Sequence, residues 1–234
     1  MRIGIIGAMD IEVQALKELM ESPKIETISS VDFYSGIING VDTVVAVAGI
    51  GKVNAAVCTQ TMILSYAPSY IINVGVAGGL APELGIGDIA VAETVVEHDM
   101  DTSPVGDAPG FISGINLIHI PCDKWLADMM YKASKNIENA NVLKGIIASG
   151  DQFIADDSQR KRITDTFGAI AAEMEGASIG HVCYMNKVPF GVLRAISDGA
   201  NSDSVMDYPT FAKMAAKNSM KIICELLEDI KAEL

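Results

Sequence analysis

Short apolar runs alternate with amphipathic segments along this chain, a pattern typical of an α/β fold. The apolar runs predict strands at residues 2–7, 41–47, 70–76, 88–97, 145–149, 169–172 and 190–196. Helical patterns lie at residues 10–20, 54–66, 125–137 and 175–185 and at the C-terminus. Because the strands do not alternate apolar with polar residues, we expect a sheet covered on both faces. We expect one domain that spans residues 1–234.

The C-terminal helix carries clear positional signals. Asp207 fits its N-cap and Pro209 its first turn. Its predicted core stripe consists of Phe211, Ala215, Ile222, Leu226 and Ile230. In the first predicted helix, Ile11, Leu16 and Leu19 lie near helical spacing.

Nearly every predicted strand ends in small residues followed by a polar or acidic one. These turns are Gly7-Ala8-Met9-Asp10, Ala48-Gly49-Ile50-Gly51, Ala77-Gly78-Gly79, Ser149-Gly150-Asp151 and Ser197-Asp198-Gly199. Ligands of α/β sheets bind at the carboxyl ends of the strands, where glycine permits close approach to the backbone. The sequence therefore predicts a site assembled from these turns.

The net charge of −13 argues against a nucleic-acid partner, which requires clustered basic residues. The one basic cluster, residues 160–162, is interpreted as a solvated helical turn. No apolar run approaches the ~20 residues that cross a bilayer, so we expect no membrane partner. The N-terminal residues predict a strand and not a signal peptide.

The four cysteines and three histidines are scattered, without the spacing of a metal site. Free cysteines suit a reducing cytoplasm, where we expect the protein to reside without a bound metal. The glycine-rich turns match neither the P-loop nor the dinucleotide-binding pattern, because Gly49-Ile50-Gly51-Lys52 lacks the preceding glycine and the following Ser or Thr.

Acidic residues follow three of the predicted strands. Asp198 ends one strand, Glu173 and Glu175 flank a methionine after another, and Glu12 lies just past the first. Each could simply cap a helix or complement its dipole. Their convergence on one rim favours a shared site instead.

Long segments of the chain resemble the 5′-methylthioadenosine/S-adenosylhomocysteine nucleosidases of the purine nucleoside phosphorylase superfamily. The segments are GIIGAMDIEV, AGIGKVNAA, IINVGVAGGL with GDIAVAE, SGDQFI, AAEMEGASIGHVC and VPFGVLRAISDGA. The resemblance implies a mixed, twisted and partly closed central sheet surrounded by helices, and a homodimer. It also implies hydrolysis of the N-glycosidic bond of 5′-thio-substituted adenosines to adenine, without a cofactor.

The resemblance also implies a role for each acid. Asp198, oriented by Ser197, would protonate N7 of adenine, and Glu12 would activate the attacking water. To act near neutral pH, Asp198 must hold its proton, so we expect its carboxyl to be partly buried. Glu175 would hold the ribose hydroxyls and stabilise the developing cation.

The resemblance further implies a substrate-binding surface. Phe153 would stack on adenine, and the backbone of Ile154 would contact its Watson–Crick edge. Met174 would pack against the sugar, and the soft apolar wall around the 5′ group would be Met9, Ile50 and Tyr208. Glu173, Ala8, Val76 and Gly78 complete the predicted substrate-binding set.

Two regions depart from the family's pattern. Residues 100–110, where the family carries aromatic side chains that cover a neighbouring subunit's 5′ subsite, hold no aromatic residue before Phe111. Val76 stands where many members carry a small hydroxyl residue. These departures leave open the order of preference among methylthioadenosine, S-adenosylhomocysteine, 5′-deoxyadenosine and a futalosine-type nucleoside.

Two rival functions stay open. A phosphorylase would need cationic groups around phosphate, whereas the turns at 8–12 and 49–54 offer only Lys52, and Glu12 would repel the anion. A nucleoside-binding module without chemistry would not need Glu12, Glu175 and Asp198 together. Both considerations favour the hydrolase.

Overall fold

The computed structural model describes residues 1–198 and 208–233, and for residues 208–212 it describes the backbone alone. The strands and helices follow in chain order: β1 (Arg2–Gly7), α1 (Asp10–Leu19), β2 (Glu21–Ile28), β3 (Val31–Ile38), β4 (Val41–Val47), α2 (Lys52–Tyr66), β5 (Tyr70–Gly79), β6 (Ile89–Glu97), the 3₁₀ turn η1 (Ser103–Val105), β7 (Ile120–Pro121), α3 (Lys124–Ser134), β8 (Val142–Ser149), α4 (Asp157–Phe167), β9 (Ala169–Glu173), α5 (Gly176–Asn186), β10 (Phe190–Asp198) and α6 (Tyr208–Glu233).

One end of the sheet closes on itself. Within the described residues the sheet has ten strands, nine of them in the order β10-β6-β8-β9-β5-β1-β4-β3-β2, with β7 paired to β6. A further pairing of β10 with β5 joins the first strand of this order to the fifth. The β10–β5, β6–β8 and β8–β9 pairs are parallel, whereas β10–β6 and β5–β9 are antiparallel. This ring confirms the expected mixed, partly closed sheet of an α/β fold.

β5 is the strand on which the whole sheet depends. β10 pairs with β5 from Ile71 to Gly78, while β1 pairs with the first half of β5 and β9 with its last two residues, Gly78 and Gly79. It therefore belongs both to the closed ring and to the open extension β1-β4-β3-β2. Its carboxyl end opens at the rim of the ring.

The strands β2 and β3 were not predicted. Residues 21–28 are mostly polar and exposed, so they lack an apolar run, and residues 31–38 are buried only in part. Both strands form an antiparallel edge beyond β4. β2 and β3 form because they pair with each other as a hairpin and because β3 pairs with β4. Their own residues carry no hydrophobic pattern that predicts a strand.

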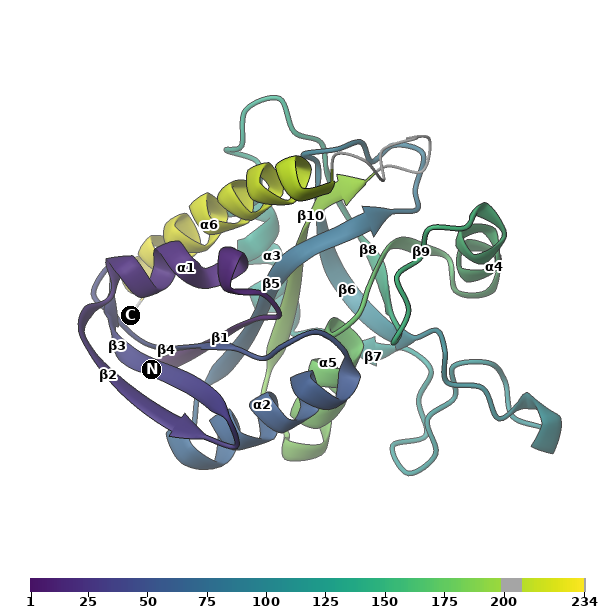
Figure 1. The fold of residues 1–234 in the computed structure, drawn as a ribbon, viewed down its shortest axis with the longest axis horizontal. Coiled ribbons are helices and arrows are strands. Elements are labelled where there is room, and N and C mark those ends of the chain that lie inside the picture. The colour runs from purple at the N-terminus through teal and green to yellow at the C-terminus, as the bar shows by residue number, and fades with distance from the viewer. Residues whose placement is uncertain (199–207, 234) are drawn as a thin grey trace.

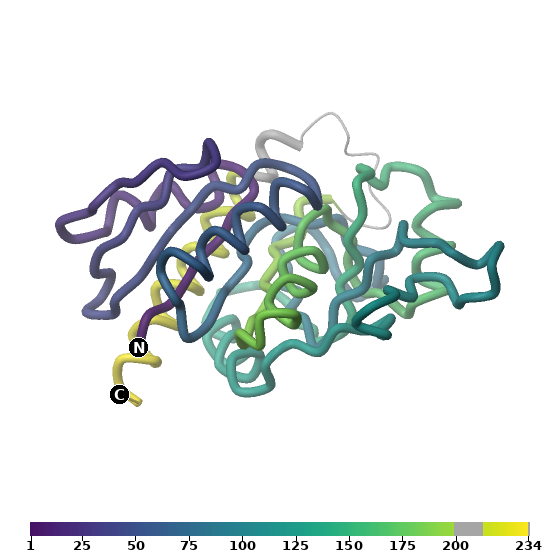
Figure 2. Tube along the Cα trace, turned by 90° about the horizontal axis from the view of Figure 1, so that it is seen from below, coloured from purple at the N-terminus to yellow at the C-terminus, as the bar shows by residue number. Residues whose placement is uncertain are grey.

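Helices cover both sides of the sheet. α1, α3 and α6 lie on one side and α2 and α5 on the other, while α4 lies beside β9 (Figure 1). Figure 2 shows α2 and α5 side by side, consistent with their mutual packing. Each side buries its own apolar cluster against the sheet. Among the described helices, none combines the length and the apolar character needed to span a bilayer.

In α6 and α1, the apolar positions predicted from the sequence can be compared with the burial of the side chains. Ala215, Ile222, Leu226 and Ile230 are fully buried in α6, which confirms that part of the stripe. Asp207 and the side chains of Pro209 and Phe211 lie outside the described residues. The helix predicted at residues 10–20 is present as α1; of the three residues at helical spacing Leu16 is buried, whereas Ile11 and Leu19 are exposed, and Glu12 and Val13 are buried in addition.

We predict that Leu226→Ala lowers the free energy of unfolding by about 2–5 kcal/mol, because it removes a fully buried side chain and leaves a cavity. Lys221→Ala, an exposed position of the same helix, is the control and should shift stability by less than about 0.5 kcal/mol. Urea unfolding followed by circular dichroism measures both. Equal stability of the two variants would contradict this packing of α6.

Candidate active site

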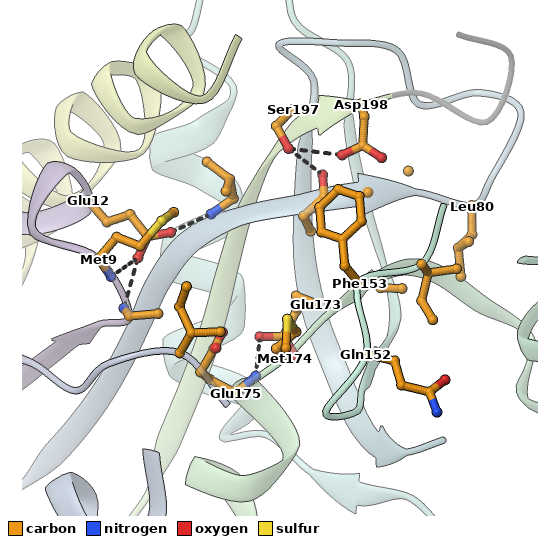
Figure 3. Close-up of a pocket in the computed structure, with 18 of the residues that line it drawn as sticks. Met9, Glu12, Leu80, Gln152, Phe153, Glu173, Met174, Glu175, Ser197 and Asp198 are labelled. Carbon is orange, nitrogen blue, oxygen red and sulfur yellow. Dashed lines mark hydrogen bonds between the residues drawn. The ribbon is translucent and has the colours of Figure 1, made fainter. Parts of the chain in front are cut away.

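A cavity opens at the carboxyl ends of β1, β5, β9 and β10, with an empty volume of about 710 Å³ that includes its mouth. Every predicted site residue whose side chain is described lines it: Ala8, Met9, Glu12, Ile50, Val76, Gly78, Phe153, Ile154, Glu173, Met174, Glu175, Ser197 and Asp198. Tyr208 begins α6, but its side chain lies outside the described residues. In Figure 3, Glu12 and Asp198 lie on opposite sides of the cavity, with Phe153 and Glu175 between them.

Backbone amides hold the Glu12 carboxylate in place. Its Oε2 accepts hydrogen bonds from the amides of Ala8 at 2.8 Å and Met9 at 2.9 Å, and its Oε1 accepts one from Val76 at 3.1 Å. Burial raises the pKa of Glu12 above its usual range, opposed by the charge of Arg194 and by these amides. A methyl group at Gly75 would lie 2.6 Å from Oε1, so only glycine admits this approach.

Glu173 and Glu175 lie where β9 meets α5, and the surroundings of their two carboxylates differ. Glu173 accepts hydrogen bonds from the amides of Glu175 and Gly176 and from the Ser149 hydroxyl, and it forms a buried ion pair with Arg194. Through these contacts Glu173 caps α5. Glu173 also lies in the lining of the cavity.

Glu175 has fewer protein partners than Glu173. Its Oε1 accepts a hydrogen bond from the amide of Gly51 at 2.8 Å, which ties α5 to the loop before α2. Burial, together with the nearby negative charge of Glu173, raises the pKa of Glu175 to about 7. Near neutral pH, Glu175 therefore exchanges readily between its acid and carboxylate forms.

Asp198 ends β10 at the opposite wall. Ser197 donates a hydrogen bond to its Oδ1 at 3.0 Å, and the guanidinium of Arg160 lies 3.3 Å from its Oδ2. The Asp198 side chain is 13% exposed, in line with the partial burial expected from the sequence. A methyl group at Gly78 would lie 3.0 Å from Oδ2, so β5 leaves room for this carboxyl group.

Apolar side chains complete the cavity. Phe153 and Ile50 are more than half exposed at its mouth, and Met9, Val76, Ile154 and Met174 lie along its walls. Large exposed apolar side chains beside a cavity are typical of a site that binds an apolar or aromatic group.

Six residues of the lining are absent from the predicted site set: Ala77, Gly79, Leu80, Gln152, Arg160 and Ala172. The interpretation of residues 160–162 as a solvated turn was right about the helix and wrong about Arg160, which is mostly buried. The spacing of Arg160 from Ile163 and Phe167 places it on the inward face of α4, a signal that was present in the sequence.

The described residues contain no group of three or more His, Cys, Asp or Glu side chains arranged to hold a metal. The cavity instead combines carboxylates held by amides, a carboxyl group beside a guanidinium, and apolar walls. This arrangement can move protons at two separated points while it holds an aromatic ligand between them.

Comparisons with known proteins show the family of the chain. Residues 2–228 match the model of the phosphorylase superfamily. A 5′-methylthioadenosine/S-adenosylhomocysteine nucleosidase of Shewanella sediminis is 42% identical, over 98% of this chain and 100% of that protein.

Solved structures give the same result. The nucleosidase of that name from Neisseria meningitidis, in complex with methylthio-immucillin-A, matches with a TM-score of 0.92 and 34% identity, over 97% of this chain and 99% of that one. The native futalosine hydrolase of Helicobacter pylori matches with a TM-score of 0.91 and 33% identity, over 97% of both chains. The chain belongs to the phosphorylase superfamily, within the family of 5′-methylthioadenosine/S-adenosylhomocysteine nucleosidases.

Proposed function

We propose that this protein hydrolyses the N-glycosidic bond of 5′-methylthioadenosine and S-adenosylhomocysteine, releasing adenine and the 5′-substituted ribose. The observation that carries the proposal is the placement of Asp198, Glu12 and Glu175 around one cavity with apolar walls. Cleavage of an N-glycoside needs an acid for the leaving base, stabilisation of a ribosyl cation and an activated water. Three separate carboxyl groups can meet these three needs.

Asp198 is the proposed acid. Its proton passes to N7 of adenine while the electron pair of the C1′–N9 bond moves into the base, so that adenine leaves neutral. The Ser197 hydroxyl, hydrogen-bonded to Oδ1, leaves Oδ2 to face the cavity. The exposed ring of Phe153 provides the stacking surface for the base, beside Ile154.

Glu12 is the proposed base for water. As a carboxylate it accepts a proton from the water that attacks C1′, and the raised pKa of Glu12 makes it a stronger base than an exposed glutamate. Glu175 accepts hydrogen bonds from the ribose hydroxyls, and its negative charge stabilises the cation that develops at C1′. Met174 packs against the sugar, and Met9, Ile50 and Tyr208 form the wall around the 5′ group.

Phosphorolysis, the rival chemistry of the superfamily, is disfavoured by the position of Glu12. The amides of Ala8, Met9 and Val76 converge as in a typical anion site, yet the Glu12 carboxylate already occupies them. Lys52, the cation that the sequence offered for phosphate, is bound by Glu97 and Asp99. Water, being neutral, is the nucleophile that this arrangement favours.

The proposal also covers the domain organisation, the cofactor requirement, the location and the further substrates of the enzyme. We propose that residues 1–234 form one nucleosidase domain that works without a cofactor in the cytoplasm, in methionine salvage and nucleoside catabolism. The futalosine hydrolase among the similar structures makes a futalosine-type nucleoside a further candidate substrate. 5′-Deoxyadenosine, which lacks the thioether, is another.

We propose a homodimer as well. Val53, Val57 and Leu64 are exposed on one side of α2 and form what we term the α2 apolar face. Exposed apolar faces of this kind mark protein interfaces. Residues 100–118 extend away from the ring, in a position to reach a second subunit (Figure 1).

The acid assignment predicts that Asp198→Asn lowers kcat for adenine release from 5′-methylthioadenosine by at least about 100-fold, because asparagine has no proton to give to N7. Release by the unmodified enzyme should be independent of added phosphate. Liquid chromatography of adenine measures both. Phosphate-dependent release would move the protein to the phosphorylases, and near-normal activity of the variant would remove Asp198 from its role.

The pKa of Glu175 near 7 predicts that ligands with a ribose diol bind more weakly as the pH falls through 7. Protonation removes the charge that accepts the hydroxyl hydrogen bonds, so the Kd should rise towards about tenfold per pH unit. Calorimetry with an uncleavable C-glycoside of methylthioadenosine measures this. The 2′,3′-dideoxy analogue and the variant Glu175→Gln should both show a nearly flat profile, and a steep profile in either would contradict the assignment.

The dimer proposal predicts that Leu64→Glu yields monomers, because it places a charge in the α2 apolar face. Leu19→Glu, at an exposed leucine of α1, should leave the dimer intact. Sedimentation velocity distinguishes the two states. A monomeric unmodified protein would refute the proposal outright.

A further inference from the structure

Arg160 reaches the cavity because of its place on α4. The side chain of Asp156 caps the first turn of this helix through the amides of Ser158 and Gln159. Ile163 and Phe167 are buried and anchor α4. Arg160 lies three and seven residues before them, on the same face, and so points inward.

Its neighbour Lys161 points the other way. Lys161 is exposed and pairs with Asp165 on the outer face of the helix. The two cations are adjacent in sequence, yet only Arg160 lines the cavity.

Arg160 and Asp198 form an ion pair with little solvent access. Nη2 of Arg160 lies 3.3 Å from Oδ2 of Asp198, and the two side chains are 15% and 13% exposed. Oδ1 of Asp198 is engaged by Ser197 instead. The guanidinium therefore lies beside the oxygen that faces the cavity.

The proposed reaction changes the charge of this oxygen. When the proton moves from Asp198 to N7 and the C1′–N9 electron pair moves into the base, Asp198 becomes a carboxylate. The other acids on the cavity, Glu12, Glu173 and Glu175, cannot stabilise a further negative charge. A neighbouring guanidinium can.

We propose that Arg160 is a positioning residue that stabilises the carboxylate left on Asp198 when its proton passes to the departing base. The inference rests on the proposed nucleosidase function and adds a residue to it. Arg160 acts through Oδ2 of Asp198 and not on the substrate itself.

The ion pair favours proton transfer, because it stabilises the carboxylate that the transfer leaves on Asp198. Among the described residues, the groups that face Asp198 are Arg160 from α4 and Ser197 from β10, with uncharged Gly78 from β5 and the carboxylates of Glu12, Glu173 and Glu175 across the cavity. Replacement of Arg160 by an uncharged residue therefore removes the cation that lies beside Asp198.

The test compares Arg160→Leu, Arg160→Lys and Lys161→Gln with the unmodified enzyme on 5′-methylthioadenosine. For Arg160→Leu we expect kcat to fall by about 10- to 100-fold, the range of one charge-assisted hydrogen bond. Arg160→Lys should recover most of the rate, because it restores a cation beside Asp198. Lys161→Gln should match the unmodified enzyme.

A second substrate separates this role from a structural one. In p-nitrophenyl 5-methylthio-ribofuranoside the leaving group departs as a stable phenolate and has no N7. Arg160→Leu should cleave it nearly as fast as the unmodified enzyme does, which also shows that the variant is folded.

The outcomes are distinguishable. Equal loss on both substrates, or an Arg160→Lys variant no faster than Arg160→Leu, would overturn the inference while leaving the nucleosidase in place. An unmodified enzyme that releases no adenine would overturn the proposed function and this inference with it.

Discussion

The buried ion pair between Arg194 and Glu173 is the interaction on which the site depends. Charges removed from water cost several kcal/mol unless partners surround them, so the pair persists only with its whole network intact. Arg194 also binds the side chain of Asn73, which donates to the carbonyl of Ile6, and Glu173 binds Ser149. One pair thus links β10, β9, β8, β5 and β1 at the level of the cavity. The amide caps that position Met174 and Glu175 follow from it.

Much of the site could be predicted from local patterns in the sequence. An acid directly after an apolar strand must lie at the carboxyl edge of the sheet, which is how Glu12 and Asp198 were found. Arg160 was missed because a basic run is usually solvated, and only its spacing from Ile163 and Phe167 reveals its inward direction. The capping of α5 by Glu173 was not predicted, because residue type and position alone do not reveal which backbone amides a carboxylate will accept from.

The fold was predictable where each element carries its own hydrophobic signal. The strands of the ring and the helices α2, α3, α5 and α6 are such cases. β2 and β3 are not, because their residues are largely polar or exposed and their pairing comes from a hairpin beside β4. Closure of the ring depends on β5 pairing with β1, β10 and β9 in succession, a long-range arrangement that no local window of sequence contains.

The two glycines of β5 that face carboxylates have a geometric consequence. Glu12 approaches the strand at Gly75, and Asp198 approaches it at Gly78. At about 3.3 Å per residue, three residues of strand separate these points by about 10 Å. The strand therefore fixes the separation between Glu12, the proposed base for water, and Asp198, the proposed acid for adenine. Insertion of one residue between the glycines would shift the register of the end of β5 against β10 and β9 and so change this separation.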